Sequence, residues 1–340
     1  MISNFLKERK AWEVDLSLGE PKVSLAATLE VHGDLFKSFK FDDDDLAYQP
    51  YQGNISLVEE LAYKHNVETD RIIITCGGKQ GLCAAVYAAK KAGLIDNFMD
   101  MPAYIQRPSW PLLADPFGLN GVSFSHIPDG STLDLIVSPN NPDGRITKFD
   151  GSKPVIHDAV YACQPYAKKP SKKSLDTSFA TIFSFSKEYG ISGARTGYVI
   201  CADSSTAKTI SHYVEESSAG TSGFSQSLIA EILRRERKDF NVLNRRLGHA
   251  IEHLQRCYLY LELYFRKNIF ERSQVNNSFP FAWLKKGSAF DQSMFDRLSI
   301  KLMDGAGFGD ANFVRLNMAA GDNSFIEAEN RLKEELFTNY

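Results

Sequence analysis

The sequence lacks the features by which several classes of protein are recognised. Its 340 residues contain no apolar run long enough for a membrane-spanning helix, and the first twelve residues, MISNFLKERKAW, lack the apolar core of a signal peptide. The formal net charge is only −3, which gives no reason to expect a nucleic-acid partner. These absences predict a soluble, cytoplasmic globular protein without a membrane anchor.

Cysteine is also scarce, with five residues in the chain. The number is odd, and the spacings match no zinc-binding pattern. We therefore expect reduced structural thiols, no disulfide framework and no metal site.

What the sequence does contain is an alternation of short apolar, β-branched runs with helical patterns. A helix is predicted over 79–93. The predicted strands cover 71–75, 97–101, 122–127, 133–138, 154–158, 180–185 and 197–202. Continuous apolar strands separated by helices favour a mainly parallel sheet covered on both faces, with the chemistry at the carboxyl ends of the strands.

The last third of the chain has a different pattern. Residues 224–267 read as a long helical stretch, and an α+β pattern follows it. Its apolar stripe consists of Leu243, Leu247, Ile251, Leu254, Tyr258, Leu261 and Phe265. We predict a large domain over 39–235 and a small domain over 236–340, which the N-terminal segment 1–38 joins.

The most informative stretch is FSFSKEYGISGARTGYVI, residues 183–200. Lys187 follows a predicted strand and is flanked by Ser184 and Ser186, and Arg195 comes eight positions later. A lysine that does covalent work needs a lowered pKa and access to a carbonyl group. The two hydroxyl groups and the guanidinium group suit a phosphate. Together they indicate a phosphorylated cofactor that carries an aldehyde.

Other predicted strand ends carry weaker signals. In TCGGKQGL, Gly78 and Lys79 begin a helix whose N-terminus can bind an anion, although a plain tight turn is the alternative. Asn141 lies in SPNNPDG, which alone reads as a β-turn. Asp158 and Tyr161 lie in HDAVY, where the aspartate is more often a helix cap.

Two further residues are candidates for the same site. Tyr104, in MPAYIQRP, is predicted to stack on a flat ring, with an ordinary core or surface role as the alternative. Arg315 lies in an otherwise apolar strand, ANFVRLNM. A buried arginine needs an anionic partner, either a ligand carboxylate or an internal acid.

In this order and spacing, the segments resemble the fold-type I pyridoxal-phosphate-dependent enzymes of the class I/II aminotransferase group. The resemblance implies a mainly parallel seven-stranded sheet covered by helices, with a smaller α+β domain. It implies that Lys187 forms the Schiff base with pyridoxal 5′-phosphate and shuttles a proton, while Asp158 pairs with the ring nitrogen and Tyr104 stacks on the ring.

The remaining roles also come from the resemblance. It assigns Asn141 and Tyr161 to the ring's 3-oxygen, and Arg315, Asn141 and Gly19 to the amino-acid and 2-oxo-acid substrates. It implies a homodimer in which Tyr48 reaches the phosphate of the neighbouring active site. The phosphate site would consist of Gly78, Lys79, Ser184, Ser186 and Arg195.

A narrower likeness is to the alliinase and tryptophan-aminotransferase-related branch. It rests on SPNNPDG, on SSAGTSGFSQ (217–226) and on the short connection from Asn141 to Asp158, where most of the group has a helix. SKEYGISGAR departs from that branch's usual motif. The cofactor residues do not separate an aminotransferase from a C–S β-lyase of the alliinase type, and we prefer the former.

Two other classes fit the sequence less well. A non-catalytic pyridoxal-phosphate domain of a transcription regulator would carry a DNA-binding module, and no helix-turn-helix pattern precedes residue 15. A nucleotide-binding protein built on GGKQG would need a magnesium-binding Ser or Thr. Aromatic residues make up 12% of the chain, and Tyr48, Tyr51 and Trp110 are candidates to line a pocket for an aromatic or bulky apolar side chain.

Overall fold

The computed structural model describes residues 14–96, 102–272 and 277–337. The strand expected over 97–101 lies outside these residues. The strands are β1 (Val14–Asp15), β2 (Ile72–Thr75), β3 (Ala103–Ile105), β4 (Phe124–Ser125), β5 (Leu133–Val137), β6 (Val155–Asp158), β7 (Ala180–Ser184), β8 (Gly197–Cys201), β9 (Phe281–Lys285), β10 (Ile300–Lys301), β11 (Met303–Asp304) and β12 (Phe313–Asn317).

The helices fall between and after these strands. They are α2 (Lys22–Ser38), α3 (Asp43–Leu46), α4 (Ile55–His65), α5 (Gly77–Lys91), α6 (Asp115–Leu119), α7 (Lys172–Thr177), α8 (Phe185–Glu188), α9 (Ser204–Ser218), α10 (Gly223–Lys238), α11 (Phe240–Leu259), α12 (Leu261–Arg266), α13 (Gln292–Arg297) and α14 (Asp322–Phe337). The short 3-10 helices are η1 (Thr69–Arg71), η2 (Pro111–Leu113), η3 (Ser192–Ala194) and η4 (Gly305–Phe308). Among the described residues, no helix is long and apolar enough to cross a membrane.

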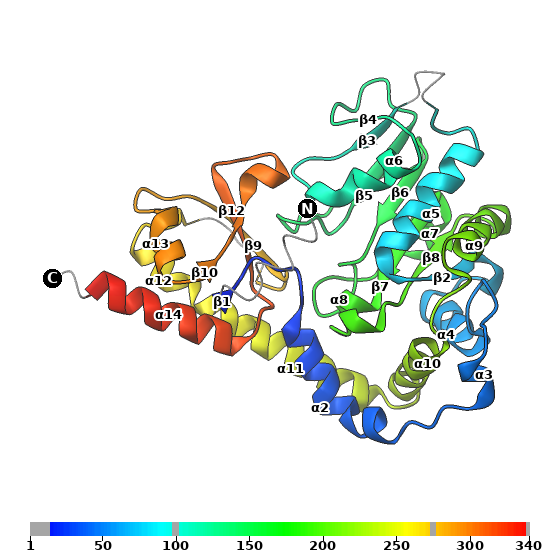
Figure 1. The fold of residues 1–340 in the computed structure, drawn as a ribbon, viewed down its shortest axis with the longest axis horizontal. Helices are drawn as coiled ribbons and strands as arrows, with labels where there is room; N and C mark the ends of the chain where they lie inside the picture. The colour runs from blue at the N-terminus through cyan, green and yellow to red at the C-terminus, as the bar shows by residue number, and fades with distance from the viewer. Residues whose placement is uncertain (1–13, 97–101, 273–276, 338–340) are drawn as a thin grey trace.

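The main sheet has seven strands in the order β2-β8-β7-β6-β5-β3-β4. All neighbouring pairs are parallel except those of β8, which runs antiparallel to both β2 and β7. Helices α5, α6 and α9 bury one face of this sheet, and α4 and α10 cover part of the other. The predicted mainly parallel seven-stranded sheet is confirmed (Figure 1).

The second unit is built around the three-stranded antiparallel sheet β11-β12-β9. The N-terminal strand β1 pairs with β10 in parallel, so the start of the described chain lies against the C-terminal part. Helix α11 runs from the large sheet towards this second unit, and α2 packs beside it (Figure 1). Segments from both ends of the described chain thus pack together in this second unit.

The long helical stretch differs from its sequence-based prediction in two ways. It consists of three helices, α10, α11 and α12, because Asp239 and Tyr260 interrupt it. Ile251, expected in the apolar stripe, is 41% exposed, whereas Ala250, Arg246 and Cys257 are buried. The buried face is therefore rotated and includes a charged residue, whose partners are described below.

Candidate active site

Lys187 lies on α8, a one-turn helix directly after β7. The structure thus places it just past a strand, as the sequence predicted, on a short helix. Its Nζ donates a hydrogen bond to the carbonyl oxygen of Gly19, 2.6 Å away. Burial, with a smaller contribution from Arg315, lowers the pKa of Lys187 from 10.5 to about 8. About a tenth of this amine is therefore neutral at pH 7, far more than for an ordinary lysine, and the neutral form is the nucleophile.

Gly19 brings the N-terminal segment against the lysine. A β-carbon at this position would lie 3.7 Å from Nζ of Lys187 and 3.9 Å from the hydroxyl oxygen of Tyr161. The ring of Tyr161 is also 5.6 Å from Nζ of Lys187. The predicted residues Gly19, Lys187 and Tyr161 therefore line one small space.

Asp158 ends β6 and is buried. Its Oδ1 accepts a hydrogen bond from the backbone N–H of Val160 at 3.2 Å. Burial raises the pKa of Asp158 to about 6, and the positive charge of Lys187 only partly opposes this. A cationic group bound beside this carboxylate would favour its ionised form. The protonated nitrogen of a pyridinium ring is such a cationic group.

Arg315 lies on β12 and is buried. Its Nη1 donates to Oδ1 of Asn141 at 3.0 Å, and its Nη2 donates to the carbonyl oxygen of Ser17. Its Nε has no partner, and no carboxylate of a described residue lies within ion-pair distance. Burial lowers the pKa of Arg315 to about 10, so the group lacks the anion that its position calls for.

Asn141 and Tyr161 present hydrogen-bond donors beside this arginine. Because Oδ1 of Asn141 accepts from Arg315, its Nδ2 remains as a donor. Within the described part of the chain, the hydroxyl of Tyr161 has no hydrogen-bond partner, and burial raises its pKa. Both side chains are buried, so two neutral donors are available to one oxygen of a bound molecule.

A second candidate anion site lies at the N-terminus of α5. Gly77 has φ +72°, and a β-carbon there would lie 2.7 Å from Nη2 of Arg195. A β-carbon at Gly197 would lie 2.7 Å from the carbonyl carbon of Gly77, so this glycine allows β8 to approach the helix. Arg195 has hydrogen bonds only to the carbonyl oxygens of Ser192 and Cys76 in the described chain.

The other predicted phosphate residues surround this point. A β-carbon at Gly78 would lie 3.7 Å from Cβ of Ser184. Oγ of Ser184 accepts from the backbone N–H of Ser186 at 3.3 Å, which caps the start of α8. The side chain of Lys79 is bound to the carbonyl oxygen of Leu112. Lys79 therefore has only its backbone N–H, in the first turn of α5, to offer to an anion.

Tyr104 does not lie where the sequence analysis placed it. Tyr104 lies within β3 and pairs with Asp134 of β5. Asp158 of β6 pairs with Val137, which is three residues further along β5. Tyr104 is therefore about 10 Å below the edge that carries Asp158. The prediction placed P-A-Y after a strand end, whereas Ala103 and Tyr104 lie inside β3 itself.

Trp110 is an aromatic residue that lies near this edge. Its ring centroid lies 5.3 Å from Nζ of Lys79, beside the first turn of α5. The segment before it is held to the end of β5, because Nδ2 of Asn140 donates to the carbonyl oxygen of Pro108 at 2.9 Å. The sequence RPSW already pointed to Trp110, because this tryptophan and the proline two residues before it come shortly after a strand end.

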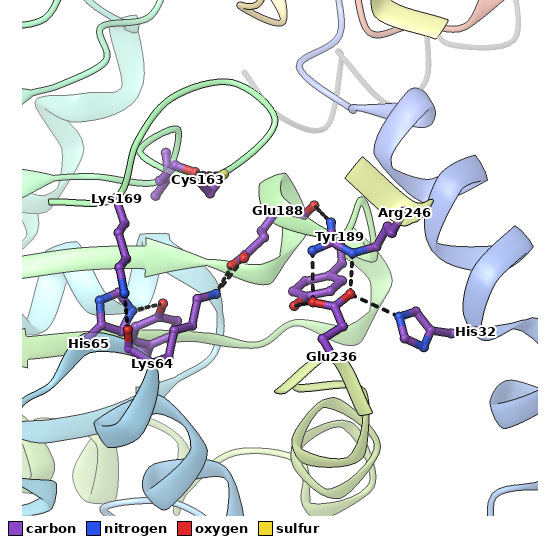
Figure 2. A network of polar contacts seen from close by, with 11 residues as sticks. His32, Lys64, His65, Cys163, Lys169, Glu188, Tyr189, Glu236 and Arg246 are labelled. Carbon is purple, nitrogen blue, oxygen red and sulfur yellow. Dashed lines mark hydrogen bonds and ion pairs between the residues drawn. The ribbon is translucent and has the colours of Figure 1, made fainter. Parts of the chain in front are cut away.

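A buried ionic network supports α8 from below, as Figure 2 shows. Tyr189, two residues after Lys187, donates its hydroxyl hydrogen to Oε2 of Glu236 at 2.9 Å. Arg246 donates to both carboxylate oxygens of Glu236, at 2.5 and 3.1 Å, and its guanidinium carbon lies 4.2 Å from the centroid of the Tyr189 ring. Nε2 of His32 lies 3.1 Å from Oε1 of Glu236. Helices α2, α10 and α11 thereby meet under the lysine.

Tyr48 lies away from these groups on the described chain. It is 89% exposed, between α3 and α4. Tyr51 is also exposed. Neither residue contributes to the space around Lys187 within one chain.

Known proteins share both the sequence pattern and the architecture. The Allinase family model (Alliinase_C) matches residues 117–246. Tryptophan aminotransferase-related protein 2 of Arabidopsis thaliana is 28% identical over 248 residues, which are 65% of this chain and 54% of that protein. The match therefore spans about half the length of this relative.

Two further comparisons extend over more of the chain. The bifunctional aspartate aminotransferase and glutamate/aspartate-prephenate aminotransferase of Petunia hybrida is 24% identical, with 86% of this chain and 70% of that protein covered. The aspartate aminotransferase of Thermus thermophilus, solved with maleate, superposes with a TM-score of 0.78 at 17% identity, covering 97% of this chain and 94% of that chain. The expected aminotransferase resemblance and fold-type I architecture are confirmed.

Proposed function

We propose that the chain is a pyridoxal-phosphate-dependent aminotransferase that moves the amino group of an L-α-amino acid to a 2-oxo acid. The observation that carries the proposal is the pair of arginines without carboxylate partners in the described chain, Arg195 at the N-terminus of α5 and Arg315 on β12. Lys187 and Asp158 complete the same strand-end site. One arginine suits the phosphate of the cofactor, and the other suits the carboxylate of a substrate.

The site fits pyridoxal phosphate at each of its polar groups. The phosphate would lie among Arg195, Ser186 and the free N–H groups of α5. Asp158 would face the ring nitrogen, and Asn141 and Tyr161 would donate to the ring's 3-oxygen. When bound, this cofactor supplies an aldehyde that captures amines and a ring that withdraws electrons from their α-carbon.

The chain's own contribution is to bind, orient and move a proton. Arg315 would take the α-carboxylate in a fork, and its contact with Asn141 would fix the substrate relative to the ring. Nζ of Lys187 would first hold the cofactor and then carry the proton that leaves the substrate's α-carbon. Its lowered pKa suits both tasks, since the amine must be neutral to accept that proton.

Aromatic side chains surround the substrate arginine. The guanidinium carbon of Arg315 lies 4.2 Å from the ring centroid of Phe281 and 5.2 Å from that of Phe308. Trp110 lies at the same edge of the large sheet, beside α5. These rings support an aromatic or bulky apolar amino donor.

A homodimer is part of this proposal. Tyr48 is almost fully exposed, on a segment that also exposes Leu46 and Tyr51. Apolar and aromatic groups exposed together favour a protein contact. The partner subunit would receive Tyr48 at its phosphate site.

A C–S β-lyase of the alliinase type is the second candidate, favoured by the family model that matches 117–246. Incubation of the purified holoenzyme with twenty amino acids, with and without pyruvate or 2-oxoglutarate, separates the two. The aminotransferase requires an acceptor and releases no ammonia. Ammonia and pyruvate formed from a sulfur-substituted cysteine without any acceptor would instead establish the lyase.

A further inference from the structure

A cavity of about 890 Å³ lies on the face of the large sheet opposite α5. Its floor is formed by alternate residues of two strands, Ile136 on β5 and Val155 and His157 on β6. Its walls are the segments 146–153 and 168–177. Its volume is within the range of small-molecule sites, roughly 300–1,000 Å³.

The cavity exists because this part of the sheet has no covering helix. The core beneath α4 and α10 includes Ile72, Tyr198 and Phe183, from β2, β8 and β7, but no residue of β5 or β6. The short connection after Asn141 crosses the sheet as a loop. Ile136 and Val155 are buried, yet neither belongs to the main hydrophobic clusters.

A buried polar atom lies in the floor of this cavity. His157 is 4% exposed, and its Nε2–H donates to the carbonyl oxygen of Ser138 at 3.0 Å. That bond fixes the tautomer, so Nδ1 is an acceptor, and it has no partner. Oγ1 of Thr181, the register neighbour of His157 on β7, is also unsatisfied. Buried groups of this kind are rarely left without a partner.

The rim of the cavity is basic. It contains five lysines and two aspartates. Lys153 is paired with Asp134 at 3.2 Å, and Lys169 is bound to the carbonyl oxygen of Lys64. Asp150 is exposed and accepts from the N–H of Ser152.

Three lysines of the rim remain uncommitted. Lys148, Lys168 and Lys173 are exposed, and their ammonium groups have no hydrogen bond or ion pair within the described chain. Three free cations around an apolar floor with an unsatisfied acceptor suit an anion attached to a group that carries a hydrogen-bond donor.

We propose that this cavity is a second ligand site, separate from the Lys187 site, that binds a small phosphomonoester carrying hydroxyl or N–H groups. The phosphate lies among Lys148, Lys168 and Lys173. The organic part lies over Ile136 and Val155. Its donor reaches the buried Nδ1 of His157 when the side chains over that atom, the Phe149 ring at 5.2 Å from the His157 ring among them, move aside. His157 is hydrogen-bonded to the carbonyl oxygen of Ser138, which lies just after β5 and three residues before Asn141. A ligand bound to His157 therefore contacts the segment that positions Asn141.

Calorimetric titration of the holoenzyme tests this site. Pyridoxal phosphate fills the catalytic phosphate site, so added phosphomonoesters report on other sites. The probes are AMP, glucose 6-phosphate and glycerol 3-phosphate, each compared with its phosphate-free counterpart. We expect at least one phosphomonoester to bind with a Kd below about 1 mM and its counterpart to bind far more weakly.

Substitutions locate the binding. The triple variant Lys148→Ala, Lys168→Ala, Lys173→Ala should weaken binding about tenfold or more. A control variant with the same charge change, Lys40→Ala, Lys208→Ala, Lys238→Ala, removes exposed lysines elsewhere and should bind like the wild type. His157→Phe should also weaken binding, and if that variant fails to fold, the lysine variants decide.

The proposal is overturned if no phosphomonoester binds, if the rim variant binds like the wild type, or if both triple variants lose affinity equally. The visible absorption of the bound cofactor should stay the same in both triple variants. Failure of this site is therefore distinguishable from failure of the proposed aminotransferase activity.

Discussion

Nη1 of Arg315 donates a hydrogen bond to Oδ1 of Asn141 over 3.0 Å, across 174 positions of sequence. The arginine belongs to the small sheet and the asparagine follows β5 of the large one. This contact places a buried cation from one unit against the strand ends of the other. Substrate carboxylate and cofactor ring would thus be held by groups that touch one another.

Replacing Arg315 should therefore impair substrate use more than cofactor binding. In Arg315→Ala, loss of about 3 kcal/mol of charged hydrogen bonding predicts a fall of about 100-fold in kcat/KM for amino acids. Steady-state kinetics measure this. Arg272→Ala, which removes an exposed arginine paired with Glu262, is the control. An equal loss with an amine that lacks the α-carboxylate would contradict the role assigned to Arg315.

The rate of cofactor capture should follow the titration of Lys187. Burial lowers the folded-state pKa from 10.5 to about 8, so the amine is protonated and unreactive below that pH and neutral above it. Stopped-flow absorbance of the apoprotein mixed with pyridoxal phosphate should show a rate that rises about tenfold per pH unit up to pH 8 and then levels off. A rate that keeps rising to pH 10 would show an ordinary lysine.

Breaking the network beneath α8 should destabilise the fold. Glu236→Gln leaves the buried Arg246 without its counter-charge, and a cost of about 3 kcal/mol in the free energy of unfolding is expected. Urea denaturation measures it. Glu231→Gln, on the same helix but more exposed, should cost less than about 1 kcal/mol.

The same pair gives a pH dependence. Burial alone would raise the pKa of Glu236, but hydrogen bonds from His32 and Arg246 lower it from 4.5 to about 2. Because the folded-state pKa is depressed, the stabilisation is fully present above pH 4.5 and is lost as the pH falls towards 2. The difference of 2.5 units (4.5 − 2) corresponds to about 3 kcal/mol. In Glu236→Gln, the free energy of unfolding should fall less between pH 4.5 and pH 2 than in the wild type. The same pH dependence in both proteins would contradict this assignment.

Trp110 and Tyr104 can be compared directly. We expect Trp110→Ala to lower pyridoxal-phosphate affinity by about tenfold, because a ring at the strand edge is lost. Tyr104→Ala, which likewise removes a ring, should change it by less than about twofold, because Tyr104 lies lower in β3. Equilibrium titrations followed by absorbance decide. The reverse order of effects would restore the sequence-based assignment.

The sequence predicted the alternating strands well because each is a short apolar run bounded by turn residues, as in RIIIT before CGGKQ. It also predicted several site residues that the structure brings together, since Lys187, Tyr161 and Gly19 meet in one space. Their meeting depends on the order of the strands, which the local pattern does not encode. The resemblance to a family supplied that order.

Other features depended on tertiary structure alone. The position of Tyr104 along its strand follows from its pairing with Asp134. Because the sequence placed the end of this strand a few residues too early, it assigned the ring-stacking role to Tyr104 instead of Trp110. Arg246 lies on a helix face that looks amphipathic, and its burial becomes acceptable only because Glu236 reaches it from α10. Such pairings across helices leave no local signal.

The central claim is that Lys187 carries the cofactor. Reduction of the holoenzyme with borohydride, followed by proteolysis and mass spectrometry, tests it most directly. The account predicts one phosphopyridoxyl group, on Lys187, and a Lys187→Ala protein without visible absorption from lysine-bound cofactor. A wild-type protein that stays colourless with added pyridoxal phosphate, or a label on Lys79 instead, would contradict it.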